Sequence, residues 1–123
     1  MEHQIEIYKS IDNAIELQVN LDNDTVWLNR HQLAMLFDRD IKTIGKHINT
    51  IFDEQELDFK STVAKFATVQ IEGDRKIKRE KEHYNLDVII SVGYRVKSKR
   101  GTQFRQWATQ RLKDYYLEYK LAA

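Results

Sequence analysis

Five polar side chains in the segment 41–52 could bind a polyanion. Their spacing places them on one side of a predicted helix: Lys42, Thr43, Lys46, His47 and Asn49. Ammonium, hydroxyl, imidazole and amide groups contact phosphates and read base edges in the major groove of DNA. The pattern therefore predicts a nucleic-acid-binding helix. It also fits the solvated side of an ordinary amphipathic helix, which needs no ligand.

A second cationic group lies in the segment 75–81, which is predicted to be a strand. It contains Lys76, Lys78 and Arg79, whose side chains would supply affinity for a phosphate backbone. An edge strand that is protected from aggregation by its lysines has the same composition. Both interpretations remain open at this point.

A third group lies between two predicted helices, in the segment 94–101. Four cations fall within six residues, next to a tyrosine, a serine and a glycine: Arg95, Lys97, Lys99 and Arg100. This composition is typical of a loop that contacts phosphates. A solvated loop without a ligand is the alternative.

Residues suited to catalysis are present but are not arranged for it. His31, His47 and His83 lack the mutual spacing of metal ligands, and the chain has no cysteine. Ser91 and Ser98 belong to no motif with a histidine and an acid, and the four glycines are scattered singly. We therefore expect no enzymatic activity, no metal and no cofactor.

The segment 29–52 is predicted to position the first group as a helix-turn-helix. Asn29 and Asp40 are suited to cap two helices, and Asp38-Arg39-Asp40 supplies the turn between them. Asp38 stands where glycine is common, and Arg39 stands where an apolar residue is common. The apolar positions share one side of each helix: Leu33, Leu36 and Phe37 in the first, and Ile41, Ile44, Ile48, Ile51 and Phe52 in the second.

The remaining patterns predict strands and two more helices. Alternating apolar residues over 15–21 and a returning strand over 25–28 indicate a β-hairpin, and residues 5–8 suggest a further strand. A second hairpin is expected over 63–84, with its turn at 72–75. Asn85 is suited to cap an apolar helix, and a last helix starts at Thr102. The predicted fold class is α+β, with a β-hairpin, a winged helix-turn-helix, a second β-hairpin and two packed C-terminal helices.

Length and composition bound the class of protein. The 123 residues, 41% of them hydrophobic, suit one domain over 1–119, with the helix-turn-helix at 29–52 and the hairpin and helices at 62–119. Residues 120–123 resemble a vector-derived tail. We expect a cytoplasmic protein without membrane contact, because neither a signal-peptide pattern nor a membrane-spanning stretch is present.

The net charge of +1 hides a strong asymmetry. Residues 1–74 contain 7 Lys and Arg against 14 Asp and Glu, a formal charge of −7, whereas residues 75–123 contain 13 against 5, a charge of +8. Such a division indicates an anionic partner for the second half. Alternatively, the two halves neutralise each other within the fold.

Two segments carry a resemblance to a known family: Tyr84-Asn85-Leu86-Asp87-Val88-Ile89-Ile90-Ser91-Val92-Gly93-Tyr94-Arg95-Val96 and Arg100-Gly101-Thr102-Gln103-Phe104-Arg105-Gln106-Trp107-Ala108-Thr109. They resemble the signature of the bacterial virulence protein RhuM family. Shorter pieces agree: Trp27-Leu28, Lys46-His47-Ile48-Asn49 and Lys65-Phe66-Ala67-Thr68. The resemblance implies an N-terminal helix-turn-helix in a virulence-associated protein encoded near mobile elements. It supplies no catalytic residues.

Together these patterns predict a module that binds double-stranded DNA in a bacterial or phage-like transcriptional regulator. The helix 41–52 would read the major groove, and a homodimer formed through the C-terminal helix would supply a second half-site. The alternative is a protein-interaction or oligomerisation module of a mobile-element or toxin–antitoxin-like system. An exposed apolar stripe on the last helix and no salt-dependent DNA binding would favour that alternative.

Overall fold

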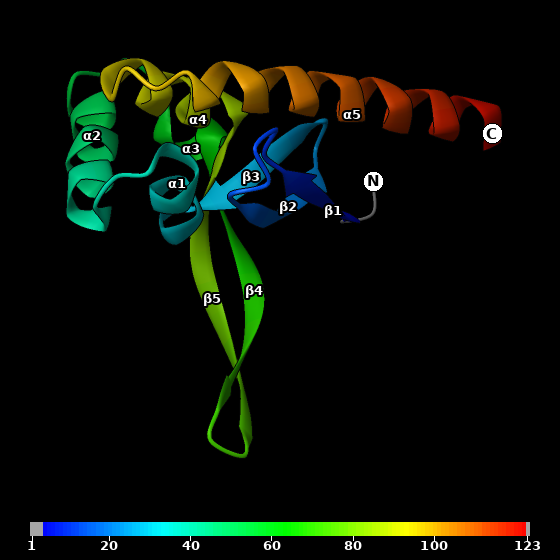
Figure 1. Ribbon diagram of the computed structural model, residues 1–123, viewed down its shortest axis with the longest axis horizontal. Helices are drawn as coiled ribbons and strands as arrows, with labels where there is room; N and C mark the ends of the chain where they lie inside the picture. Colours follow the sequence, from blue (N-terminus) through cyan, green and yellow to red (C-terminus); the bar gives the residue numbers. More distant parts are fainter. Residues whose placement is uncertain (1–3, 123) are drawn as a thin grey trace.

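One antiparallel sheet of five strands forms the centre of the molecule, and the computed structural model describes residues 4–122 (Figure 1). The spatial order is β1-β2-β3-β5-β4, with bounds β1 Gln4–Lys9, β2 Glu16–Asp22, β3 Thr25–Asn29, β4 Val63–Glu72 and β5 Arg75–Asn85. Both predicted hairpins and the further strand are confirmed. In β2 the side chains of Leu17, Val19 and Leu21 are buried, as their alternation with polar residues predicts.

Five helices complete the fold: α1 Arg30–Phe37, α2 Ile41–Asp53, α3 Phe59–Thr62, α4 Leu86–Arg95 and α5 Arg100–Ala122. Three N-caps predicted from the sequence are present. The side chain of Asn29 accepts from the amide of Gln32, Asp40 accepts from Lys42, and Asn85 accepts from Val88. Gln32 also accepts from the amide of Asn29, which completes a capping box.

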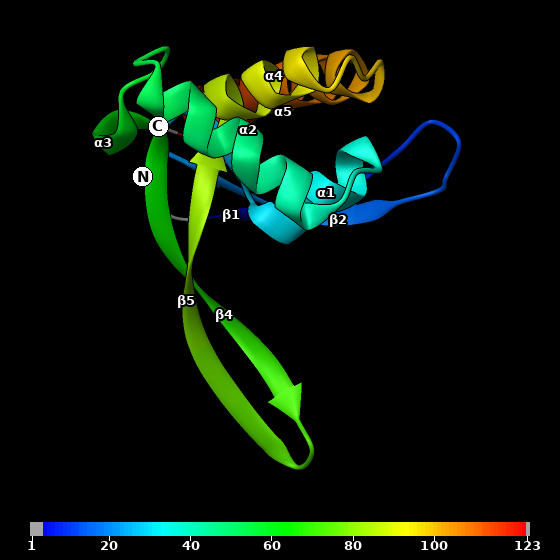
Figure 2. The same cartoon turned by 90° about the vertical axis from the view of Figure 1, so that its left-hand side faces the viewer.

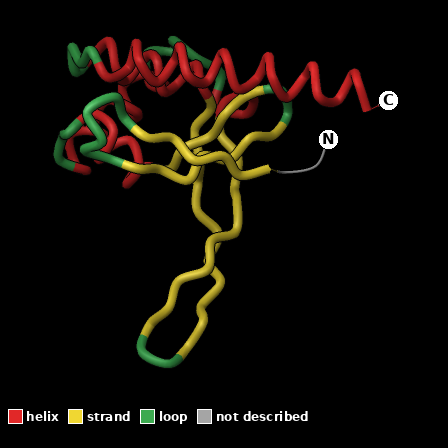
Figure 3. Tube along the Cα trace, turned by 45° about the vertical axis from the view of Figure 1, so that its right-hand side comes forward, coloured by secondary structure: helices red, strands yellow, loops and turns green. Residues whose placement is uncertain are grey.

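The α+β class is confirmed, and α4 and α5 pack on each other over one side of the sheet (Figure 3). The hydrophobic core contains side chains from both the sheet and the helices. Tyr8 of β1 lies edge-on to Phe104 of α5, with 5.0 Å between ring centroids, and Phe37 of α1 is only 1% exposed. Gly93 and Gly101 allow the two helices to meet over the Phe37 ring. A Cβ atom on Gly93 would lie 3.2 Å from two atoms of that ring.

Strands β4 and β5 extend well beyond the sheet as a two-stranded ribbon (Figure 2). Strand β3 pairs with β5 at Asn85, Tyr84 and His83, so the described residues from Glu82 to Arg75 pair with β4 alone. The ribbon turns at Gly73 and Asp74, and Gly73 has φ +61°, a conformation that glycine adopts without steric cost. The ribbon therefore projects freely from the domain.

The observed elements differ from the predicted ones at three places. A short helix, α3, follows α2, because Asp58 accepts from the amide of Ser61 and Phe59 packs on Phe52 with 5.2 Å between ring centroids. Helix α5 begins at residue 100 rather than 102. Residues 120–122 of the expected vector-derived tail continue α5, whereas residue 123 lies outside the described part.

Candidate nucleic-acid interface

The polar side of α2 faces solvent. Lys42, Lys46 and Asn49 are exposed, Thr43 and His47 are half-buried, and the opposite side buries an isoleucine row: Ile44, Ile48 and Ile51. No ion pair involves Lys42 or Lys46 among the described residues 4–122. The structure therefore brings the five predicted residues of this helix together on one accessible surface.

The turn before α2 is fixed by Arg39. Its Nη1 donates to the carbonyl oxygens of Phe37 and Asp38 at 2.9 and 3.1 Å, and its Nη2 donates to that of Val96 at 2.9 Å. Asp38 has φ +52°, and its amide closes the last turn of α1 by donating to Met35. A planar guanidinium can donate to three carbonyls at once. This explains why an arginine stands at a position where an apolar residue is common in helix-turn-helix motifs.

Arg95 was predicted to bind phosphate, but its guanidinium binds two carboxylates of the same chain. Its Nη2 lies 3.1 Å from Glu54 Oε2 and 2.9 Å from Glu56 Oε1, just after the C-terminus of α2. The hydrogen bonds that Arg95 donates to Glu54 and Glu56 raise the pKa of Arg95. Hydrogen bonds from the Ser91 side chain and then from Arg95 lower the pKa of Glu56. In the structure, Arg95 therefore ties α4 to the segment that follows α2.

Arg100 is also engaged within the fold. Its Nη1 donates to the carbonyl oxygens of Met35 and Leu36 at 3.5 and 3.4 Å, which are among the last carbonyls of α1. Its Nη2 lies 3.7 Å from Asp12 Oδ2. Arg100 thus lies against the end of α1, and its predicted contact with phosphate stays a prediction.

The segment 95–100, which we call the bracing segment, therefore holds the helical pair at three points. Arg95 binds the carboxylates after α2, the Val96 carbonyl accepts from the turn, and Arg100 binds the end of α1. The expected loop 94–101 shrinks to residues 96–99, because residues 94 and 95 belong to α4 and residues 100 and 101 to α5. The orientation of α2 depends on this segment.

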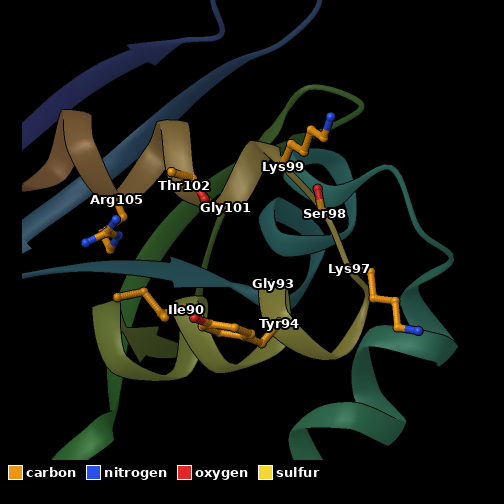
Figure 4. Close-up of a pocket in the computed structure, with 9 residues that line it drawn as sticks. All are labelled: Ile90, Gly93, Tyr94, Lys97, Ser98, Lys99, Gly101, Thr102 and Arg105. Atoms are coloured by element: carbon orange, nitrogen blue, oxygen red, sulfur yellow. The ribbon is translucent and has the colours of Figure 1, made fainter.

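Lys97 and Lys99 remain exposed and border a cavity of about 640 Å³ between α4 and α5 (Figure 4). In the close-up, Arg105 reaches from α5 towards Ile90 and Tyr94 of α4. The nine lining residues include three cations and no carboxylate, so the cavity favours an anion. Arg105 was not among the predicted site residues. Its spacing of four residues from Gly101 places both residues on the same side of α5, and this spacing alone did not indicate a cavity.

The predicted cations of the ribbon separate onto its two faces. Lys76 pairs with Ile71 and Lys78 with Val69 in the register, and both lysines are exposed. Arg79 lies on the other face, where its Nη2 is 3.1 Å from Glu72 Oε1. Lys76 and Lys78 are thus the ribbon cations of the predicted site that have no described ion pair.

Comparison with protein families adds an independent observation. Residues 61–120 match the model of the Virulence protein RhuM family. This part of the chain is similar to the RhuM family. The RhuM match contains both signature segments and the piece from Lys65 to Thr68, which confirms the resemblance there. No curated protein and no solved structure matches the chain.

The RhuM match begins after the helical pair. The pieces at 27–28 and 46–49 lie outside it, whereas the ribbon, the bracing segment and most of α5 lie within it. Within residues 4–122, no helix is both long and apolar enough to span a bilayer. The same residues contain no group of three His, Asp or Glu side chains that could hold a metal ion.

Proposed function

We propose that this chain is the DNA-binding module of a bacterial or phage-like transcriptional regulator. The observation that carries the proposal is the solvent-facing side of α2, where Lys42 and Lys46 are exposed and have no ion pair among the described residues. In this proposal α1 and α2 act as a helix-turn-helix, and α2 enters the major groove. Thr43, His47 and Asn49 would then face base edges or phosphates.

Other cations would supply contacts that are independent of sequence. Lys76 and Lys78 extend the positive surface along the ribbon, which would act as the wing of a winged helix-turn-helix. Lys97 and Lys99, with Arg105, would bind phosphate at the cavity between α4 and α5. Both groups would raise affinity without reading sequence.

The test compares two charge reversals of equal size. The double variant Lys42→Glu, Lys46→Glu is measured beside the control Lys9→Glu, Lys113→Glu, whose lysines are exposed on β1 and α5. Binding is followed by fluorescence anisotropy on a labelled mixed-sequence duplex at several salt concentrations. We expect the α2 variant to lose at least about tenfold in affinity, with a salt slope shallower by roughly two, and the control to lose much less.

Equal affinities of the wild type and the α2 variant, with the fold verified by circular dichroism, would contradict the role of this helix. If the α2 variant does lose affinity, selection of duplexes from a random pool would identify the sequence that the module recognises. Genes that carry this sequence would then indicate the regulated process.

A second candidate function is a protein-interaction or oligomerisation module of a mobile-element or toxin–antitoxin-like system. The observation that favours it is the far end of α5, where three large apolar side chains are exposed: Tyr116 by 56%, Leu117 by 57% and Leu121 by 87%. The two candidates are compatible if α5 joins two copies of a DNA-binding module. The homodimer then supplies the second half-site.

A further inference from the structure

The tip of the ribbon exposes two β-branched aliphatic side chains. Val69 is 64% exposed and Ile71 is 75% exposed, and both lie on the same face of β4 because they are two residues apart. Nearer the sheet, Phe66 on the opposite face packs on Trp27 with 5.6 Å between ring centroids. The exposed aliphatic pair is therefore a feature of the projecting tip.

The ribbon face that carries Val69 and Ile71 combines aliphatic and cationic side chains. Ile71 pairs directly with Lys76 and Val69 with Lys78, so two ammonium groups flank the aliphatic pair. Glu72 belongs to the opposite face, where it binds Arg79, and within the paired strands the first carboxylate on the aliphatic face is Glu80, opposite Ala67. Asp74 lies in the turn itself. The face thus combines an apolar pair with two cations that have no ion pair among the described residues, which complements the stacked bases and flanking phosphates of a duplex.

We infer that this face of the ribbon enters the minor groove of DNA. Val69 and Ile71 insert at a base step, partly unstack it and bend the duplex, while Lys76 and Lys78 bind the phosphates that line the groove. The inference rests on the proposed DNA-binding function and adds a second contact and a deformation to it. Kinks of this kind fall in the range of about 20–90°.

The dimensions of the ribbon agree with this contact. The eight residues of β5 from Arg75 to Glu82 that pair with β4 alone span about 25 Å at the usual rise of a strand. Half a helical turn of B-DNA is about 17 Å, which separates a major groove from the adjacent minor groove. The ribbon is long enough to reach from one to the other.

A second copy of the chain is a poorer occupant of the same face. Two identical faces packed symmetrically would bring Lys76 and Lys78 of one copy close to the same lysines of the other. Like charges facing each other across strands are destabilising, whereas the phosphates of DNA neutralise them.

The experiment uses the full chain and a 2-aminopurine-containing duplex of about 30 base pairs, a usual length for bending a protein site, with a fluorophore pair at its ends. The variant Val69→Ser, Ile71→Ser is compared with Ile5→Ser, Ile7→Ser, which removes two exposed aliphatic residues from β1. We expect the wild type and the control to bend the duplex and brighten the 2-aminopurine. The ribbon variant should bind within about tenfold of wild type but lose at least half of both signals.

The outcomes separate the inference from the proposed function. If the wild type binds without bending, or the ribbon variant bends as the wild type does, the wedge is overturned and DNA binding stands. If the wild type binds no duplex, both proposals fall. If the ribbon variant loses only self-association, measured by sedimentation, the face belongs to a second copy and the wedge is overturned.

Discussion

Glu56 is held in its ionised form by two groups of α4. Hydrogen bonds from Ser91 and then from Arg95 lower its pKa, so the folded state favours the carboxylate more than the unfolded chain does. A lowered pKa adds stability above the unfolded value of about 4.3, and this contribution disappears as the pH falls through the folded value. The tie between α2 and α4 should therefore weaken in acid.

The prediction is that Glu56→Gln destabilises the protein at pH 7 but approaches the wild type near pH 3. The free energy of unfolding, measured in urea at both pH values, checks it. Arg95→Met should retain part of the pH dependence, because the Ser91 hydrogen bond remains. An unchanged pH dependence in Glu56→Gln would show that other carboxylates account for the acid sensitivity.

Single residues also show where sequence reasoning succeeded. Asn29, Asp40 and Asn85 were identified as caps because capping depends on neighbours within three residues. The partners of Arg39 and Arg95 were not predictable, because Val96 is 57 residues from Arg39 and Glu54 is 41 residues from Arg95. Long-range partners of charged side chains depend on the finished packing, which no local pattern encodes.

At the scale of elements, the crossing of α4 and α5 depends on glycine. A Cβ on Gly93 would lie 3.2 Å from two ring atoms of Phe37, so this buried ring must give way, and 3.6 Å from the Cα of Gly101, which is an ordinary contact. A Cβ on Gly45 of α2 would lie 3.0 Å from Nη1 of Arg30, which is the end of a flexible side chain. Alanine substitutions at Gly93 and Gly45 can therefore be compared as a matched pair.

We predict that Gly93→Ala lowers the free energy of unfolding by about 1–3 kcal/mol, whereas Gly45→Ala changes it little or raises it. Overpacking dominates in the first variant, and the higher helix propensity of alanine offsets the small rearrangement in the second. Chemical denaturation of both variants checks the contrast. Equal effects would mean that backbone propensity, not contact with Phe37, determines the role of Gly93.

Elements were predicted well wherever their pattern was local. Alternation identified β2, and the turn residues at 72–75 identified the ribbon. Helical spacing with a cap identified α2, and an apolar block with a cap identified α4. Helix α3 was missed because four residues carry too little periodicity, and its position depends on the contact of Phe59 with Phe52. The loop predicted over 94–101 was too long, because the tight passage from α4 to α5 requires the approach of Gly93 to Gly101.

Across the whole molecule, the opposite charges of the two halves are partly neutralised by internal ion pairs, and some of the cations stay exposed. Of the six described ion pairs, five join the acidic first part to arginines of the basic second part: Arg79 with Glu72, Arg95 with Glu54 and Glu56, Arg100 with Asp12, and Arg111 with Glu6. Internal neutralisation therefore accounts for these arginines. The predicted lysines remain exposed, in keeping with the strong hydration of an ammonium group, and they carry the proposed site.

The exposed end of α5 predicts association of whole molecules. Leu117 and Leu121 lie one helical turn apart, and burying them between two copies would remove apolar surface from water. We expect sedimentation velocity to show a concentration-dependent dimer that Leu117→Ser, Leu121→Ser weakens at least about tenfold. Ile5→Ser, Ile7→Ser serves as the control. A monomer at all concentrations would contradict dimerisation through this helix.

The bracing segment also limits how such a module can evolve. The helical pair precedes the ribbon, but the groups that fix its turn and the end of its first helix come more than fifty residues later, inside the segment that matches the RhuM model. Recombination between residues 54 and 61 would join a pair from one ancestor to arginines from another. In chimaeras of that kind the helical pair and the bracing segment should no longer fit each other. Changes in the proposed DNA specificity are therefore expected to arise by point substitution on α2 rather than by exchange of the pair.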